Sequence, residues 1–109
     1  MKLSTFYLKT TNSTNDVAIK KIKQGLNNGI VISQIQKKGR GRYGSKWVSL
    51  KGNLFLSIFY KVDKKFNLKK ITRFHCLKIK KILSKFVNMK IKIKPPNDLL
   101  IDKKKFCGI

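Results

Sequence analysis

Gly39-Arg40-Gly41-Arg42-Tyr43-Gly44-Ser45-Lys46-Trp47 is the stretch that decides how this chain is interpreted. It combines three glycines, two arginines, a lysine and a tryptophan. Glycines let backbone N–H groups approach an anion closely, arginines offer planar forks that match phosphate or carboxylate oxygens, and tryptophan offers a flat apolar face. The segment therefore predicts an anion-binding loop of the kind that a nucleotide site needs.

Basic residues are abundant throughout the chain, so their positions need care. There are 27 Lys+Arg against 4 Asp+Glu, which gives a formal net charge of +23. The chain has three arginines and no glutamate, and Arg40 and Arg42 share the glycine-rich segment while Arg73 lies elsewhere. The clustering of arginine is the functional signal. The spread of lysine fits either a shift in codon usage or an electropositive surface.

The length and the cysteine content limit the class of protein. A chain of 109 residues predicts one small domain. Cys76 and Cys107 are too few for a disulfide scaffold or a zinc site, which favours a reducing compartment such as the cytoplasm. No apolar run approaches the roughly 20 residues of a membrane span, and no signal peptide is expected.

Strand-like and helix-like segments alternate along the chain. The polar run from Thr11 to Asn15 supplies cap residues for a helix that Gly25 and Gly29 end. A longer helix is expected from Asn67 to near Asn88, and a turn at 95–98. Strands are expected at 6–8, 30–35, 53–60, 90–94, 99–101 and 105–109, with a hairpin turn at 102–104. The glycine-rich segment joins two of these strands, where a loop is well placed for a ligand.

Several familiar motifs do not apply. Gly39, Gly41 and Gly44 satisfy the spacing G-x-G-x-x-G, but a dinucleotide site needs this motif to open a helix, and the sequence continues toward a strand. The spacing of a Walker phosphate loop is absent. His75 is expected in a surface or packing role, and Cys107 as a small core residue, because no acid or histidine is patterned near it.

Three motifs, in this order and at this spacing, carry a resemblance to a known family. They are Gly39-Arg40-Gly41-Arg42-x-Gly44-x-Lys46-Trp47, then Asn53-Leu54-x-Leu56-Ser57, then Lys94-x-Pro96-Asn97-Asp98. The chain resembles the N-terminal part of the catalytic domain of biotin protein ligases, also called biotin–[acetyl-CoA-carboxylase] ligases. The resemblance covers nearly all of the chain. It implies an α/β (α+β) fold of the class II synthetase type, with a mixed β-sheet and helices packed on one side.

The resemblance also implies roles for individual residues. Biotin-binding residues would be Ser13, Thr14, Asn15, Gln36, Arg40, Gly41, Arg42 and Lys105. Nucleotide-binding residues would be Gly39, Arg40, Arg42, Trp47, Asn97 and Asp98. Lys105, Arg40 and Arg42 would be the catalytic cations, and no metal-ligating residue is assigned.

The implied reaction joins two anions, because the carboxylate of biotin attacks the α-phosphate of ATP. Arg40, Arg42 and Lys105 would offset the repulsion, and Mg²⁺ would shield the departing pyrophosphate. The implied acceptor is a lysine of the biotin carboxyl carrier protein domain of acetyl-CoA carboxylase. No membrane and no specific nucleic acid is expected as a partner.

Two features depart from the family pattern. Pro95 stands where the family usually has tryptophan, and the chain is about half the length expected of the catalytic domain. No helix-turn-helix domain and no C-terminal β-barrel is expected within residues 1–109. We therefore expect a truncated or split ligase, catalytically incompetent alone, with a separate C-terminal half as its complement.

Two alternatives stay open. A lipoate protein ligase shares the fold, although a different loop in place of the Arg/Gly-rich segment would be expected. A basic nucleic-acid-binding protein is the alternative outside the enzymes, since a charge of +23 gives nonspecific phosphate affinity at low salt.

Overall fold

The computed structural model describes residues 2–109 and divides the chain into two compact units, with the boundary between Val62 and Asp63. The first unit contains one helix and three strands, and the second contains one helix and three strands. Each unit has its own cluster of buried apolar side chains. The two units are described separately below.

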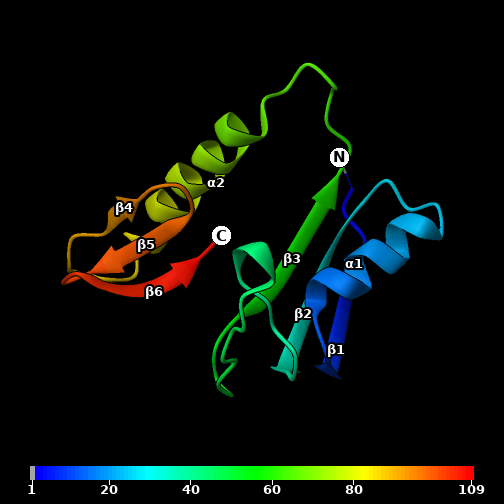
Figure 1. The fold of residues 1–109 in the computed structure, drawn as a ribbon, viewed down its shortest axis with the longest axis horizontal. Helices are drawn as coiled ribbons and strands as arrows, with labels where there is room; N and C mark the ends of the chain where they lie inside the picture. The colour runs from blue at the N-terminus through cyan, green and yellow to red at the C-terminus, as the bar shows by residue number, and fades with distance from the viewer. Residues whose placement is uncertain (1) are drawn as a thin grey trace. The chain divides into compact units, whose positions relative to one another are not determined.

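The sheet of the first unit is mixed, as expected from the sequence. Strand β1 (Thr5–Thr11) pairs in parallel with β2 (Asn28–Gln36), which pairs in antiparallel fashion with β3 (Phe55–Tyr60). Helix α1 (Thr14–Lys23) connects β1 to β2 and covers one face of the sheet (Figure 1). The antiparallel pair β2–β3 carries the glycine-rich segment in its connection.

Local signals explain where helix α1 begins and ends. The side chain of Ser13 caps the helix by accepting a hydrogen bond from the backbone N–H of Asp16. The acidic Asp16 lies in the first turn and three lysines lie in the last turn, an arrangement that complements the helix dipole. Gly25 follows the helix with a φ of +96°, a conformation that favours glycine.

The core of the first unit lies between α1 and the sheet. Val31 of β2 and Phe59 of β3 are buried against Ala18 of the helix, and Phe6 and Leu8 of β1 pack around them. Gly29 leaves room for the ring of Phe59, because a Cβ at Gly29 would lie 2.6 Å from the ring carbon Cζ. The other face of β3 carries Leu56, Ile58 and Tyr60, which are all exposed.

The second unit packs a helix on an antiparallel sheet. Helix α2 (Leu68–Leu83) precedes β4 (Lys92–Lys94), β5 (Asp98–Ile101) and β6 (Lys104–Gly108), paired in that order (Figure 1). Its core joins Cys76 of α2 to Ile91 and to Leu99 of β5. Asp102 and Lys103 form the β5–β6 turn with φ of 50° and 62°, the left-handed values that a two-residue hairpin requires.

The expected fold class is confirmed, and several expected boundaries are wrong, among them the strand expected from Lys90, which begins at Lys92. Gly29 does not end a helix but lies in β2, and the strand expected from Asn53 begins at Phe55. Helix α2 ends at Leu83, not near Asn88. The strands also divide into two three-stranded sheets, where a single sheet was expected.

Over residues 2–109, the helices are too short or too polar to span a membrane.

Candidate functional site

Polar side chains gather where helix α1 begins, on the face of the sheet that the helix covers. The backbone N–H of Thr14 donates to Oε1 of Gln36 at 3.0 Å, and Oγ1 of Thr14 lies 2.8 Å from Oγ of Ser57. The hydroxyl of Ser57 donates to Oδ1 of Asn15 at 2.6 Å. We call Ser13, Thr14, Asn15, Gln36 and Ser57 the helix-start cluster.

Burial gives the helix-start cluster a fixed shape. Ser13, Thr14 and Ser57 are buried, and Gln36 is half-buried. A buried hydroxyl or amide is costly unless it is hydrogen-bonded, so each of these groups is held by its partner. The first N–H groups of a helix have no partner within the helix, and Gln36 supplies an acceptor for that of Thr14.

The side-chain amide of Gln36 has a defined direction. The backbone N–H of Thr14 can only donate, so the atom of Gln36 that faces it is the oxygen. The amide nitrogen of Gln36 then donates to Oγ of Ser49 at 3.2 Å. Gly39 is buried beside this contact, and a Cβ there would lie 2.7 Å from the amide nitrogen and 2.6 Å from the Ser49 oxygen.

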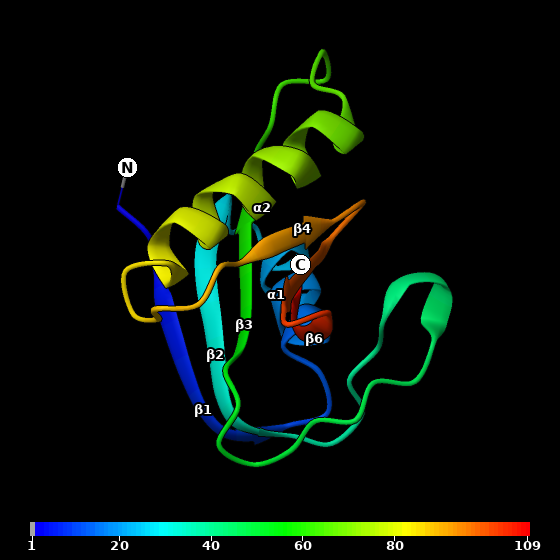
Figure 2. The same ribbon diagram turned by 90° about the vertical axis from the view of Figure 1, so that its left-hand side faces the viewer.

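The connection between β2 and β3 folds into a narrow loop. The N–H of Trp47 donates to the carbonyl of Gly39 at 3.1 Å, and the N–H of Gly41 donates to the carbonyl of Ser45 at 2.7 Å. Tyr43, at the tip, has a φ of 58° and is almost fully exposed. Figure 2 shows this loop leaving the end of the sheet where β2 finishes and extending on the side where α1 lies. The segment leads to β3 and opens no α-helix, whereas a dinucleotide fingerprint would open one.

The two loop arginines have different surroundings. The guanidinium of Arg40 donates two hydrogen bonds to Asp16, with Nη1–Oδ2 at 3.0 Å and Nη2–Oδ1 at 2.6 Å. These bonds lower the pKa of Asp16 and raise that of Arg40. Arg42 instead stacks on its neighbour Tyr43, with its guanidinium carbon 5.0 Å from the ring centre, and lies exposed at the loop tip.

The structure therefore connects most of the expected site residues of the first unit. Ser13, Thr14, Asn15 and Gln36 belong to one cluster, and Arg40 is tied to the same helix start through Asp16. Gly39 lies beside Gln36, and Trp47 lies beside Gly39. Arg42 and Gly41 lie further along the loop, without a contact to this cluster among those found in residues 2–109.

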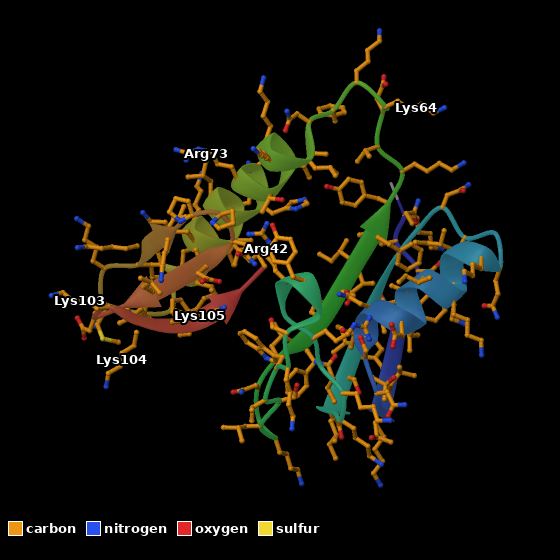
Figure 3. The ribbon with its side chains drawn as sticks, in the orientation of Figure 1. Arg42, Lys64, Arg73, Lys103, Lys104 and Lys105 are labelled. Carbon is orange, nitrogen blue, oxygen red and sulfur yellow. The ribbon has the colours of Figure 1, made fainter. Side chains whose placement is uncertain are left out.

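The second unit brings together the other three expected residues. Nζ of Lys105 lies 2.8 Å from Oδ1 of Asp98, and these residues come from the adjacent strands β6 and β5. Asn97 donates from its side chain to the carbonyl of Ile109 at 3.0 Å, and its own carbonyl accepts from the N–H of Ile109 at 2.9 Å. Figure 3 labels the three consecutive lysines, with Lys103 in the hairpin turn and Lys104 and Lys105 on β6.

The sequence offered His75, Cys76 and Cys107 as further titratable side chains. His75 lies on α2 with its ring 6.0 Å from that of Phe74. Burial raises the pKa of both thiols, Cys76 and Cys107, so neither is activated as a nucleophile. Within residues 2–109, no three His, Cys, Asp or Glu side chains are grouped as a metal site would need.

Three residues in these networks were not singled out as site residues from the sequence. Ser49 and Ser57 complete the hydrogen bonds of Gln36, Thr14 and Asn15, and Asp16 holds Arg40. A signal for Ser57 was present, because it is a serine in a strand whose neighbours on the same face, Phe55 and Phe59, are buried aromatics. Ser49 had no such signal, since it lies in an irregular loop.

Comparison with known proteins gives a family match over most of the chain. The model of the biotin/lipoate A/B protein ligase family matches residues 7–109. The bifunctional ligase/repressor BirA of Escherichia coli is 31% identical over 107 residues. That alignment covers 94% of this chain and 32% of the relative, so the chain spans about one third of the relative's length.

Solved structures show the same fold. A biotin protein ligase from Aquifex aeolicus, in complex with biotin and ATP, superposes with a TM-score of 0.81 at 30% identity, over 96% of this chain and 44% of that one. A biotin protein ligase from Leishmania major, in complex with biotinyl-5-AMP, superposes with a TM-score of 0.78 at 23% identity. That superposition covers 99% of this chain and 51% of the Leishmania major chain.

Proposed function

Because the chain belongs to the biotin/lipoate A/B protein ligase family, we propose that it carries out biotin activation and transfer as part of a biotin protein ligase catalytic domain. The observation that carries this proposal is the helix-start cluster. Ser13, Thr14, Asn15 and Gln36 were assigned to biotin from the resemblance, and the hydrogen bonds of the structure connect them around one helix start. Such an arrangement of fixed hydroxyls and amides suits a small polar head group.

The proposed first step forms an acyl-adenylate. An oxygen of the biotin carboxylate attacks the α-phosphorus of Mg·ATP, the bond from that phosphorus to the bridging oxygen breaks, and pyrophosphate leaves with the metal as part of the substrate. Both reactants are anions, so nearby cations lower the barrier by stabilising the charge that develops. Arg42 is exposed and can turn toward such an anion without breaking a carboxylate ion pair.

In the second unit, Lys105 is the proposed contact of the biotin carboxylate and the α-phosphate. Its ion pair with Asp98 gives the ammonium group a fixed place, since a lysine on a flexible stem is otherwise poorly oriented. Within this unit, Asn97 and Asp98 are the proposed nucleotide contacts.

The proposed second step transfers the biotinyl group. The amine of a lysine on a biotin carboxyl carrier protein attacks the acyl carbon of biotinyl-5′-AMP, the carbon–oxygen bond of the anhydride breaks, and AMP leaves. Closure of the Gly39–Trp47 loop would keep water from the anhydride until the amine arrives. We place the reaction in the cytoplasm, because it consumes ATP and both cysteines are free thiols.

Calorimetric titration of the purified chain with biotin, biotinyl-5′-AMP and lipoate tests the proposal. We expect biotinyl-5′-AMP to bind more tightly than biotin, and lipoate not to compete with either. Arg42→Ala should weaken biotinyl-5′-AMP about tenfold or more and biotin by a smaller factor, since a charge-assisted hydrogen bond to the phosphate is lost only with the adenylate. Lys51→Ala, in the same connection but outside the glycine-rich segment, is the control for loss of one positive charge.

Two other outcomes would replace the proposal. Preferential binding of lipoate would identify a lipoate ligase. Binding of duplex DNA that survives physiological salt, without any binding of biotin, would identify a nucleic-acid-binding protein, because purely nonspecific phosphate binding falls steeply with salt.

A further inference from the structure

Ser57 is an unusual residue for its place in the sheet. It lies on the face of β3 that packs toward α1, between Phe55 and Phe59, and only 7% of it is exposed. Its neighbour across the sheet is Val31, which is completely buried. An apolar residue would be expected at this position, since a buried hydroxyl contributes favourably only when its hydrogen bonds are satisfied.

The hydroxyl of Ser57 is satisfied by two residues of the helix-start cluster. A serine has one proton to donate, and Ser57 gives it to Oδ1 of Asn15 at 2.6 Å. In the 2.8 Å contact with Thr14, the threonine is therefore the donor. The proton of Thr14 is thus used at Ser57 rather than at Gln36, whose oxygen is 3.3 Å away and already accepts the Thr14 N–H.

This donor–acceptor sequence determines what the cluster offers a ligand. With Oδ1 of Asn15 occupied, the NH₂ group of that amide remains to donate. With its proton committed to Ser57, the hydroxyl of Thr14 remains to accept. The two groups together suit a ligand that carries a carbonyl and an N–H side by side, such as the cyclic urea of biotin.

From this arrangement we infer that Ser57 is a positioning residue of the biotin site, which it serves by fixing the direction of the Asn15 amide and of the Thr14 hydroxyl. The inference rests on the proposed function for its ligand. The role of Ser57 is indirect, since its own hydrogen bonds are made to the protein.

Ser33 provides a matched control. It is a buried serine on the same face of the adjacent strand, 2% exposed, and its hydroxyl donates to the backbone carbonyl of Ile35 at 2.7 Å. Ser33→Ala removes a buried serine hydroxyl from the same sheet face without touching the Thr14–Ser57–Asn15 contacts. Ser57→Thr is the conservative variant, because it keeps a hydroxyl and a β-branched residue suits a strand.

The experiment compares the chain with its Ser57→Ala, Ser57→Thr and Ser33→Ala variants by ¹⁵N NMR without ligand, by calorimetry with biotin, and by thermal unfolding. We expect Ser57→Ala to shift the side-chain amide signals of Asn15 and to weaken biotin binding about tenfold, the loss of one oriented hydrogen bond. Ser33→Ala should lower the unfolding temperature to a similar extent but change neither the Asn15 signals nor the affinity. Ser57→Thr should restore both.

The possible results separate the inference from the proposed function. Unchanged Asn15 signals in Ser57→Ala would overturn the positioning role, and so would equal losses of affinity in the two alanine variants. If the unmodified chain binds no biotin, the proposed function fails, while the ligand-free NMR comparison still decides whether Ser57 orients Asn15.

Discussion

At Gly39, the absence of a side chain preserves a hydrogen bond between two neighbours. A methyl group there would come within 2.7 Å of the Gln36 amide nitrogen and 2.6 Å of the Ser49 oxygen, so one of them would have to move. Because Gln36 also caps the N–H of Thr14, the movement would reach the helix-start cluster.

We therefore predict that Gly39→Ala weakens biotin binding at least tenfold while lowering the unfolding temperature only slightly, since the displaced atoms are side-chain ends. Calorimetry and thermal unfolding measure the two effects. Gly29→Ala is the opposite control, because its methyl group would meet the Phe59 ring and the backbone oxygen of Ser4 and should mainly reduce stability. Equal binding by Gly39→Ala and the unmodified chain would contradict the prediction.

The Asp16–Arg40 ion pair holds the base of the loop to the start of α1. Its two hydrogen bonds use both terminal nitrogens of Arg40, so this arginine tethers the loop to the helix. Arg42, by contrast, contacts Tyr43, so it can turn toward a ligand without breaking an ion pair of the kind that Arg40 makes with Asp16.

The pH dependence of this tether follows from the lowered pKa of Asp16, whose main cause is the hydrogen bond from Arg40. A carboxyl group with a lowered pKa in the folded state contributes stability above its unfolded pKa, about 3.9, and loses it as the pH falls through the folded value. We predict a change in the fluorescence of Trp47, the single tryptophan, below about pH 4. Asp16→Asn should lack this change and resemble the low-pH form at pH 7. A transition of the same size in Asp16→Asn would show that another carboxyl group causes it.

Helix α2 offers a prediction at the scale of an element. The side chain of Asn67 accepts a hydrogen bond from the N–H of Lys69 at 2.8 Å and caps the helix. Asn67→Ala should cost about 1 kcal/mol of unfolding free energy, the usual value for such a cap. Urea denaturation measures it, and Asn53→Ala, in a loop without a helix to cap, is the control. No loss in Asn67→Ala beyond that of the control would contradict the capping role.

Elements with local signals were predictable from the sequence. The polar run at 11–15 contains Ser13, the N-cap of α1, as expected. Helix α2 begins one residue after the start expected at Asn67, and the β-branched run at 30–35 lies within β2. The end of α2 was missed because Val87, beyond the helix, still packs on the same core, so the apolar spacing continues past Leu83. Gly29 was misread as the end of a helix. A glycine is needed there because the ring of Phe59, from another strand, approaches the backbone closely.

The site could be predicted only in part, for a similar reason. Motifs reveal residues that a ligand requires, whereas Ser57 and Asp16 are defined by partners 42 and 24 residues away in the chain. Such pairs follow from the parallel and antiparallel pairings of β2, which bring the helix start, the loop base and β3 together. Hydrophobic periodicity carries no information about them.

At the scale of the whole molecule, the net charge of +23 opposes compactness through self-repulsion. We predict that raising NaCl from about 0.01 M to about 0.3 M increases the unfolding temperature, because salt shortens the range of that repulsion from roughly 30 Å to under 8 Å. Calorimetric melting curves measure the shift, and sucrose at matched osmolality controls for solvent effects other than screening. A chain that melts at the same temperature in both salt concentrations would contradict the prediction.

Apart from Ser57, strand β3 is apolar on both of its faces, and this bears on how the strand aligns with β2. Sliding it by one residue would exchange Phe55 and Phe59 for Leu56, Ile58 and Tyr60 beneath α1. Hydrophobicity discriminates weakly between these two alignments, since either set could be buried. The slid alignment would turn the Ser57 hydroxyl away from Thr14 and Asn15 and would leave the space above Gly29 unfilled. A serine that orients ligand-binding groups thereby also selects the register in which the sheet assembles.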